Sequence, residues 1–124
     1  MADIEETLRD IVRIDGVLGA SIVDYFSRLT LGAVGTAGPD LEKAALGDTD
    51  VVRAKLFTLE LLGYRQDRIE DILITLDSEY HLIRPLVRRR RYEGVFLYVV
   101  LDRARMDPVA ARDWMRAAED RLEL

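Results

Sequence analysis

The stretch IDGVLGASIVDYFSRLTLG, from Ile14 to Gly32, decides the fold because it reads as strand, tight turn and strand. Apolar and small residues predict a first strand over 17–25 and a second over 29–34, joined by a turn at 26–28. Both faces of the first strand are mostly apolar or small, which is typical of a strand covered on both sides. We therefore expect helices on both faces of the sheet that this hairpin begins.

Two glycines stand at the start of the first strand, Gly16 and Gly19. Glycine inside a strand often marks a place where another part of the protein approaches closely. Turn chemistry at the end of the preceding helix is a sufficient reason for Gly16 but not for Gly19. We expect both glycines to let a helix pack closely on this strand.

The composition is that of one globular domain, predicted to span 1–124, with 49% hydrophobic and 33% charged residues. The net charge of −5 disfavours nucleic acid as a partner, because duplex binding depends on basic residues that neutralise phosphates. The absence of cysteine excludes disulfides and thiol chemistry. The beginning of the sequence lacks an apolar signal core, and no apolar run approaches the roughly 20 residues that span a bilayer. We expect a cytoplasmic protein without stable membrane association.

Aspartates in N-cap positions predict three helices, which begin after Asp3, Asp40 and Asp107. The second helix is long, covers 41–62 and ends at Gly63. At about 1.5 Å per residue it would reach across a small domain.

Three further strands are predicted, over 68–77, 79–87 and 94–102. The last of them is apolar on both faces and should therefore be central. The order is helix, two strands, helix, three strands, helix. This order predicts an α/β fold of the α+β type, with the long helix on one face of a five-stranded sheet and the two terminal helices on the other.

The long helix carries more apolar surface than packing on a sheet requires. One stripe suits the sheet and consists of Leu41, Ala45, Val52, Leu56 and Leu59. A second stripe consists mostly of small residues, namely Ala44, Gly47, Val51, Ala54, Thr58, Leu61 and Leu62. Because a surface helix needs one stripe, we interpret the second as contact with a partner, which small residues allow to approach closely. The alternative is a helix buried more deeply in its own fold.

The strand predicted over 68–77 adds a second apolar feature. At a sheet edge, Ile69, Leu73 and Ile74 would form a template that natural edges usually blunt. Pairing with the same strand of a second copy would cover that edge and make the same patch meet itself.

The elements resemble, in order and spacing, the roadblock family of the dynein light chain roadblock type. In the first hairpin the resemblance rests on Ile14, Gly16, Val17, Gly19, Ala20, Ile22, Val23, Asp24, Leu29 and Leu31. Near the other end it rests on LYVVLDR at 97–103 and on Pro108, Val109, Ala110, Ala111 and Arg112. The element order matches over nearly the whole chain, so the chain resembles a bacterial or archaeal stand-alone member.

The resemblance implies a five-stranded antiparallel sheet of the profilin-like kind. It also implies a homodimer in which the long helices lie side by side and the third strands pair into one continuous sheet. The dimer interface is then expected at Ala44, Gly47, Val51, Ala54, Lys55, Thr58, Leu62, Ile69, Asp71 and Leu73.

The resemblance further implies a protein without catalytic residues of its own that binds and regulates a small Ras-like GTPase, acting on its switch loops from outside. Two alternatives stay open, an assembly subunit without effect on GTP turnover and a sensor domain for a small ligand. The large side chains of Phe96, Leu97, Tyr98 and Leu101 argue against a ligand cavity in the sheet.

Two features are candidate partner contacts. Roadblock proteins often carry glycine in the first hairpin turn, where this chain has Phe26, Ser27 and Arg28. Phe26 at the turn tip would contact a partner, or alternatively fold back onto the core. The basic run consists of Arg88, Arg89, Arg90 and Arg91. It would meet an acidic partner, a phosphate or an anionic membrane surface, or alternatively form a solvated loop.

The sequence carries no motif that is typical of catalysis or cofactor binding. The glycines before the long helix lack the Gly-Lys-Ser/Thr of a phosphate-binding loop. The only histidine, His81, is interpreted as structural or surface-exposed, and Asp48 and Asp50 are expected to face solvent or to bond Arg53. We therefore predict no catalytic, metal-binding or cofactor-binding residue, and no cofactor.

Overall fold

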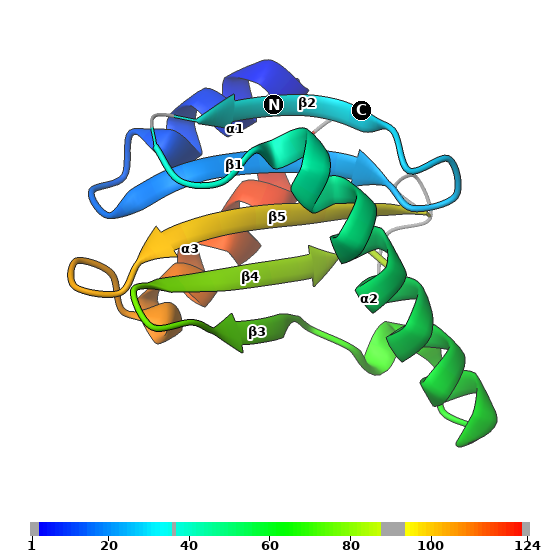
Figure 1. The fold of residues 1–124 in the computed structure, drawn as a ribbon. Helices are drawn as coiled ribbons and strands as arrows, with labels where there is room; N and C mark the ends of the chain where they lie inside the picture. Colours follow the sequence, from blue (N-terminus) through cyan, green and yellow to red (C-terminus); the bar gives the residue numbers. More distant parts are fainter. Residues whose placement is uncertain (1–2, 36, 88–93, 123–124) are drawn as a thin grey trace.

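The computed structural model describes residues 3–35, 37–87 and 94–122. Figure 1 shows its elements in chain order, from blue to red. They are α1 (Ile4–Val12), β1 (Val17–Asp24), β2 (Thr30–Gly35), α2 (Leu41–Leu61), the short 3₁₀ helix η1 (Gln66–Arg68), β3 (Ile72–Thr75), β4 (Glu79–Pro85), β5 (Val95–Asp102) and α3 (Pro108–Arg121). The basic run at 88–91 lies outside the described residues.

The five strands form one antiparallel sheet in the order β2-β1-β5-β4-β3. Helix α2 crosses one face of the sheet, and α1 and α3 cover the other (Figure 1). The predicted fold class, element order and central position of β5 are confirmed. No described helix has both the length and the apolar character needed to cross a membrane.

Side chains of β5 alternate between two hydrophobic cores. Leu97, Val99 and Leu101 pack with residues of α1 and α3. Phe96, Tyr98 and Val100 pack with residues of α2. Because successive side chains of a strand point to opposite faces, a strand that is apolar throughout needs a helical layer on each side.

The three predicted N-caps are confirmed, because each aspartate accepts backbone hydrogen bonds from the first turn of its helix. The Asp3 carboxylate accepts from the Glu6 N–H at 2.8 Å. The Asp40 carboxylate accepts from two N–H groups of α2, and the Asp107 carboxylate accepts from one of α3. These bonds satisfy N–H groups that have no partner within the helix.

The expectation that a helix approaches the first strand is wrong for Gly16, whereas at Gly19 the nearest side chain does come from a helix, Leu41 of α2. A Cβ on Gly16 would meet Arg105 and Met106, in the loop between β5 and α3, and a Cβ on Gly19 would meet Leu41 only at an ordinary contact distance of 3.5 Å. The helix that packs most tightly on the hairpin is α1, and it lies on β2. A Cβ on Gly32 would stand 2.6 Å from Ile4 Cγ2. The tightest helix contact on the first hairpin is therefore at Gly32, on its second strand. The glycine pattern of the sequence did not indicate this position.

Strand β3 is shorter than the strand predicted over 68–77. It pairs with β4 from Ile72 opposite Ile83 to Thr75 opposite Tyr80. Continuing this register would place Glu70 opposite Pro85, which has no N–H to donate. The chain before β3 therefore leaves the sheet, and 66–68 forms a 3₁₀ turn instead.

Candidate interaction surface on the long helix

One side of α2 packs on the sheet. Its buried residues are Ala45, Asp48, Thr49, Val52, Leu56 and Leu59. This set contains four of the five apolar residues predicted for the sheet side, and the fifth, Leu41, is partly buried. The prediction of a sheet-facing stripe is confirmed.

The opposite side of α2 is apolar and is left uncovered by the rest of the chain. Val51 is 38% exposed and Leu62 is 57% exposed. Ala54 is exposed too, and nothing lies within 4 Å of the place where a Cβ on Gly47 would stand. The alternative of a helix buried in its own fold is therefore wrong for this side. Uncovered apolar surface on one helix makes this side of α2 the candidate interaction surface.

A groove runs between α2 and the chain that leads into β3. It has a volume of about 530 Å³, and its lining residues are Val51, Ala54, Lys55, Thr58, Ile69, Asp71 and Ile72. All of these except Ile72 belong to the set predicted for the dimer interface. Residues from two separate segments of the sequence thus meet at one groove.

The other members of the predicted set lie elsewhere. Ala44 and Gly47 stand on α2 before the groove, partly buried and exposed respectively, and Leu62 follows the end of the helix. Leu73 packs against the core on the α1 and α3 side of the sheet, so its side chain does not reach the groove. The strand that carries it is nevertheless at the sheet edge, where β3 pairs only with β4 within the described residues.

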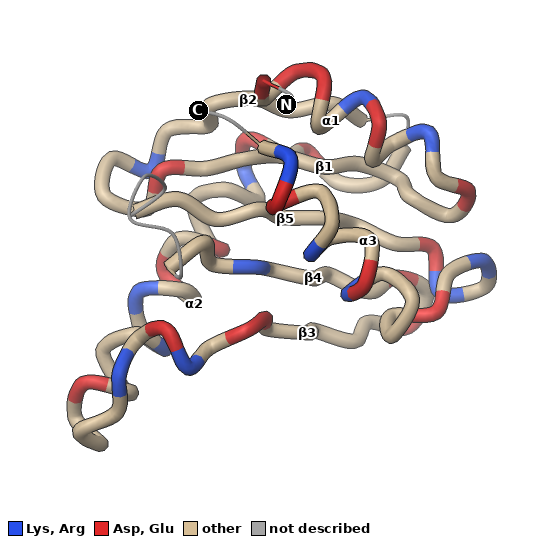
Figure 2. The backbone as a smooth tube through the Cα atoms, turned by 180° about the vertical axis from the view of Figure 1, so that it is seen from behind, with Lys and Arg blue, Asp and Glu red and all other residues tan. Residues whose placement is uncertain are grey.

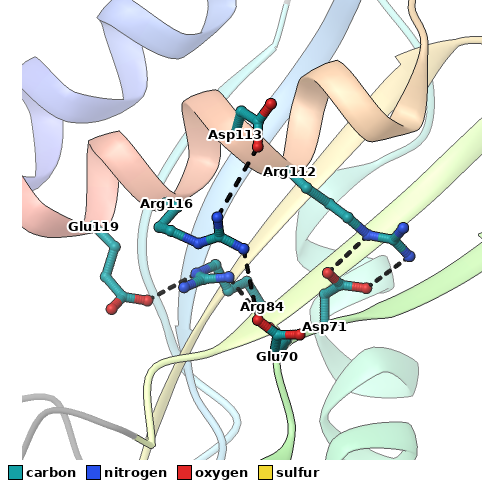
Figure 3. Close-up of polar contacts among 7 residues, drawn as sticks. All are labelled: Glu70, Asp71, Arg84, Arg112, Asp113, Arg116 and Glu119. Atoms are coloured by element: carbon teal, nitrogen blue, oxygen red, sulfur yellow. Dashed lines mark hydrogen bonds and ion pairs between the residues drawn. The ribbon is translucent and has the colours of Figure 1, made fainter.

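Arginines of α3 and β4 hold the groove wall at 69–71. Figure 3 shows Arg112 of α3 bound to the Asp71 carboxylate by two hydrogen bonds, of 2.8 and 3.0 Å. Arg116 lies 3.5 Å from a carboxylate oxygen of Glu70. Arg84 of β4 donates to the Glu70 carbonyl at 3.4 Å. The wall is therefore fixed by side chains on the face of the sheet opposite α2.

A second hollow, of about 360 Å³, lies on the other flank of α2 beside the first hairpin turn. Its apolar and aromatic lining includes Tyr25, Phe26 and Phe57. Phe26 is 68% exposed, but its ring lies against Gly94, where a Cβ would stand 2.4 Å from it. The side chain thus rests partly on its own subunit and still presents most of its surface to solvent.

The first hairpin turn needs no glycine. The Asp24 carboxylate accepts hydrogen bonds from the N–H groups of Phe26 and Ser27, at 2.8 and 3.3 Å. Arg28 adopts the left-handed conformation at φ 68° that glycine would otherwise fill. Its guanidinium lies 2.7 Å from the Asp50 carboxylate of α2. Asp50 thus faces solvent, as one of its two expected placements had it, and it pairs with Arg28 and not with Arg53, which ties the turn to the long helix.

Beneath α2 lies a polar network that sequence reasoning missed. His81 Nε2 lies 2.8 Å from Glu79 Oε1, and His81 Nδ1 lies 3.1 Å from the Tyr98 hydroxyl. Asp48 was expected to face solvent, but it is buried, and its Oδ2 has no hydrogen-bond partner among the described residues. Burial raises the pKa of the Asp48 carboxyl to about 6, and the charge of His81 opposes this rise.

Tyr98 belongs to the same network through its hydrogen bond with His81. Burial raises the pKa of the Tyr98 hydroxyl, and the carboxylates of Asp48 and Glu79 raise it further. The interpretation of His81 as structural is consistent with its two hydrogen bonds and partial burial. Within the described residues, no three histidine or carboxylate side chains come together as they would to hold a metal ion.

Comparisons with known proteins match the structure but not the sequence. No protein-family model and no curated protein matches the chain by sequence. Among solved structures, the Roadblock/LC7 domain from Streptomyces avermitilis superimposes with a TM-score of 0.75 at 14% identity, over 96% of this chain and 93% of that one.

Two solved MglB proteins superimpose as well. The gliding protein MglB from Thermus thermophilus gives a TM-score of 0.76 at 17% identity, over 94% of this chain and 82% of that one. An MglB with a tetrameric arrangement gives a TM-score of 0.74 at 19% identity, over 94% of this chain and 83% of that one. Three-dimensional similarity over more than nine-tenths of the chain agrees with the resemblance seen in the first hairpin and the last strand. The chain has the Roadblock/LC7 fold.

Proposed function

We propose that the protein is a non-enzymatic, dimeric module that binds and regulates a small Ras-like GTPase. The observation that carries this proposal is the apolar side of α2, which the chain leaves uncovered beside an open sheet edge. The Roadblock/LC7 fold and the resemblance to the roadblock family support it, because that resemblance implies regulators or platforms for such GTPases.

Pairing of two copies would cover both the apolar side of α2 and the edge strand β3. Small residues on α2, such as Gly47 and Ala54, would let a second α2 approach closely, and β3 would pair with β3 of the other copy. A two-fold axis makes the same groove meet itself, so one patch suffices for a closed dimer. The tetrameric arrangement of one MglB supports assembly as a property that this fold allows.

The GTPase would bind a surface that pairing leaves free. The flank of α2 that carries Phe57, together with Phe26 at the hairpin turn, lies away from the groove and keeps its aromatic rings exposed. Aromatic residues in a shallow hollow are typical anchors of protein interfaces. We propose Phe26 as a partner contact on this basis, with binding that acts on the switch loops from outside and donates no catalytic group.

The test begins with the mass of the protein in solution. Static light scattering at micromolar concentration should give twice 14.2 kDa, and the mass of a single chain would overturn the dimer. Small Ras-like GTPases from the same genome are then tested by pull-down, and GTP turnover is measured with and without saturating protein. A change in turnover supports regulation. Binding with unaltered turnover would leave an assembly subunit in place of a regulator.

A further inference from the structure

A polar hollow lies next to the groove, beside the C-terminal end of α2. It has a volume of about 520 Å³ and receives residues from α2, from the segment before β3 and from α3. A hollow of this size suits a small molecule, since ligand pockets typically measure roughly 300–1,000 Å³. It borders the groove, with which it shares Lys55, Ile69 and Asp71.

Positive charge predominates in this hollow. Its four cations are Lys55, Arg68, Arg112 and Arg116. The lining also holds two carboxylates, Glu70 and Asp71, so four positive and two negative charges leave a net charge of +2. The whole chain has a net charge of −5, so the net charge of the hollow is opposite in sign to that of the protein. Figure 2 shows the acidic and basic residues spread along the chain on the face that carries α3.

Two of the cations have no carboxylate partner within the described residues. The Arg68 guanidinium lies over the ring of Tyr64, 4.1 Å from its centroid, which orients the guanidinium without neutralising it. Lys55 forms no ion pair with a described residue. These two side chains therefore approach the hollow from α2 and from η1 with their charge not neutralised.

The other two cations are held in place by the carboxylates of the lining. Arg112 uses Nε and Nη2 on Asp71, which leaves Nη1 without a bond to that carboxylate. Arg116 meets Glu70 at 3.5 Å and Asp113 at 4.0 Å, both longer than a strong charge-assisted bond (Figure 3). The carboxylates thus orient arginines that retain donors for a further acceptor.

We propose that this hollow binds a small anion with two or more negative charges, of the phosphate or phosphate-ester class. A planar guanidinium fits two phosphate oxygens at once, and an ammonium adds a point charge that can follow the bound group. Cations from three elements converge, so an anion would join α2, η1 and α3. The proposal does not depend on GTPase binding, although an anion here would lie next to the groove proposed for pairing.

Isothermal titration calorimetry with inorganic pyrophosphate at low ionic strength tests the proposal, with sodium chloride at matched ionic strength as the reference. We expect saturable binding with one site per chain that weakens as salt is raised. Loss of one charge-assisted contact should weaken binding about tenfold in Lys55→Ala and in Arg68→Ala, and the double variant should bind no measurable pyrophosphate. Arg121→Ala removes an exposed arginine of α3 outside the hollow and should bind like the wild type.

Absence of pyrophosphate binding in the folded protein, or undiminished binding in the double variant, would overturn the site. Titration with ribose 5-phosphate then separates inorganic phosphate from a phosphate ester as the better ligand. Arg68 does not line the groove, so Arg68→Ala should leave the mass in solution unchanged. A monomer that binds pyrophosphate would remove the proposed dimer and keep the anion site.

Discussion

The Arg84 guanidinium of β4 donates from Nε to Oε1 of Glu119 on α3 at 2.8 Å, and both side chains are almost fully buried (Figure 3). The two residues stand 35 positions apart in the sequence. Arg84 also reaches the Glu70 carbonyl, so one side chain links α3, β4 and the groove wall. A buried charge needs such partners, because leaving it unpaired in the core is costly.

Removing one member of this pair should destabilise the fold strongly. We expect Arg84→Met alone to lower the free energy of unfolding by about 3–5 kcal/mol, because Glu119 would keep a buried charge without its guanidinium. The double variant Arg84→Met and Glu119→Leu should lose much less free energy of unfolding, since neither buried charge then remains. Urea unfolding followed by circular dichroism measures both variants. Equal losses in the single and double variants would contradict a dominant role for the buried charge.

Asp48 should make stability depend on pH. Its pKa rises from 3.8 to about 6 on folding, so the folded chain holds the proton more tightly than the unfolded chain. Its contribution is therefore fully present below about pH 4 and is lost as pH rises through 6. Since a tenfold difference in proton affinity corresponds to about 1.4 kcal/mol, the stability lost over this range reaches at most about 3 kcal/mol.

The measurement is the free energy of unfolding from pH 4 to pH 8 for the wild type and for Asp48→Asn. The wild type should lose stability relative to the variant over this range. The groups that interact with Asp48 are His81 and Tyr98, and both proteins retain them. Asp50→Asn is the matched control, since that carboxylate lies on the exposed side of α2. A constant difference between wild type and Asp48→Asn would show that Asp48 does not titrate in this range.

Charges placed on the uncovered side of α2 should separate the proposed dimer. Val51→Asp and Thr58→Arg each put a charge in the groove, where pairing would bury it without a partner. We expect the dissociation constant to rise about tenfold or more, seen as a shift toward monomer in size-exclusion chromatography with light scattering. Arg53→Asp, on the opposite flank of the same helix, should leave the mass unchanged. Unaltered elution of both groove variants would place the interface elsewhere.

Gly94 and Phe26 should show energetic coupling. Gly94 has φ +86°, and a side chain there would meet the Phe26 ring. Gly94→Ala should cost about 1–2 kcal/mol from the left-handed backbone alone, and more from the contact with the ring. In a Phe26→Ala background the additional cost from the contact with the ring should disappear. Thermal unfolding of the four proteins of this double-mutant cycle gives the coupling, and additive effects would argue against the contact.

Much of the fold could be predicted from the sequence, because its signals are local. Asp3, Asp40 and Asp107 cap their helices through bonds to N–H groups two or three residues away. The sheet-facing stripe of α2 repeats with the period of a helix, and the apolar run of β5 identified the central strand. These features depend on neighbours in the chain, which a sequence displays directly.

The predictions that proved wrong concern residues whose partners are distant. Asp48 has the spacing of a solvent-facing acid, but the packing of α2 on the sheet buries it beside Tyr98 and His81. Glycine patterning indicated Gly16, where a loop and not a helix lies close, and did not indicate Gly32, where α1 packs most tightly, because neither segment alone encodes the placement of α1 over β2. The early end of β3 follows from Pro85 of the neighbouring strand, and no signal within 68–77 predicts it.

By itself the sequence determined the elements, their order and the presence of a second apolar side on α2, because periodicity and capping are properties of short segments. The tertiary structure alone decided which residues share a surface. It brought Ile69 and Asp71 to α2 to form the groove, and it assembled the cations of the neighbouring hollow from three elements. Electrostatic and packing interactions act through space, so contacts such as Asp71 with Arg112, 41 residues apart, exist only once the chain has folded.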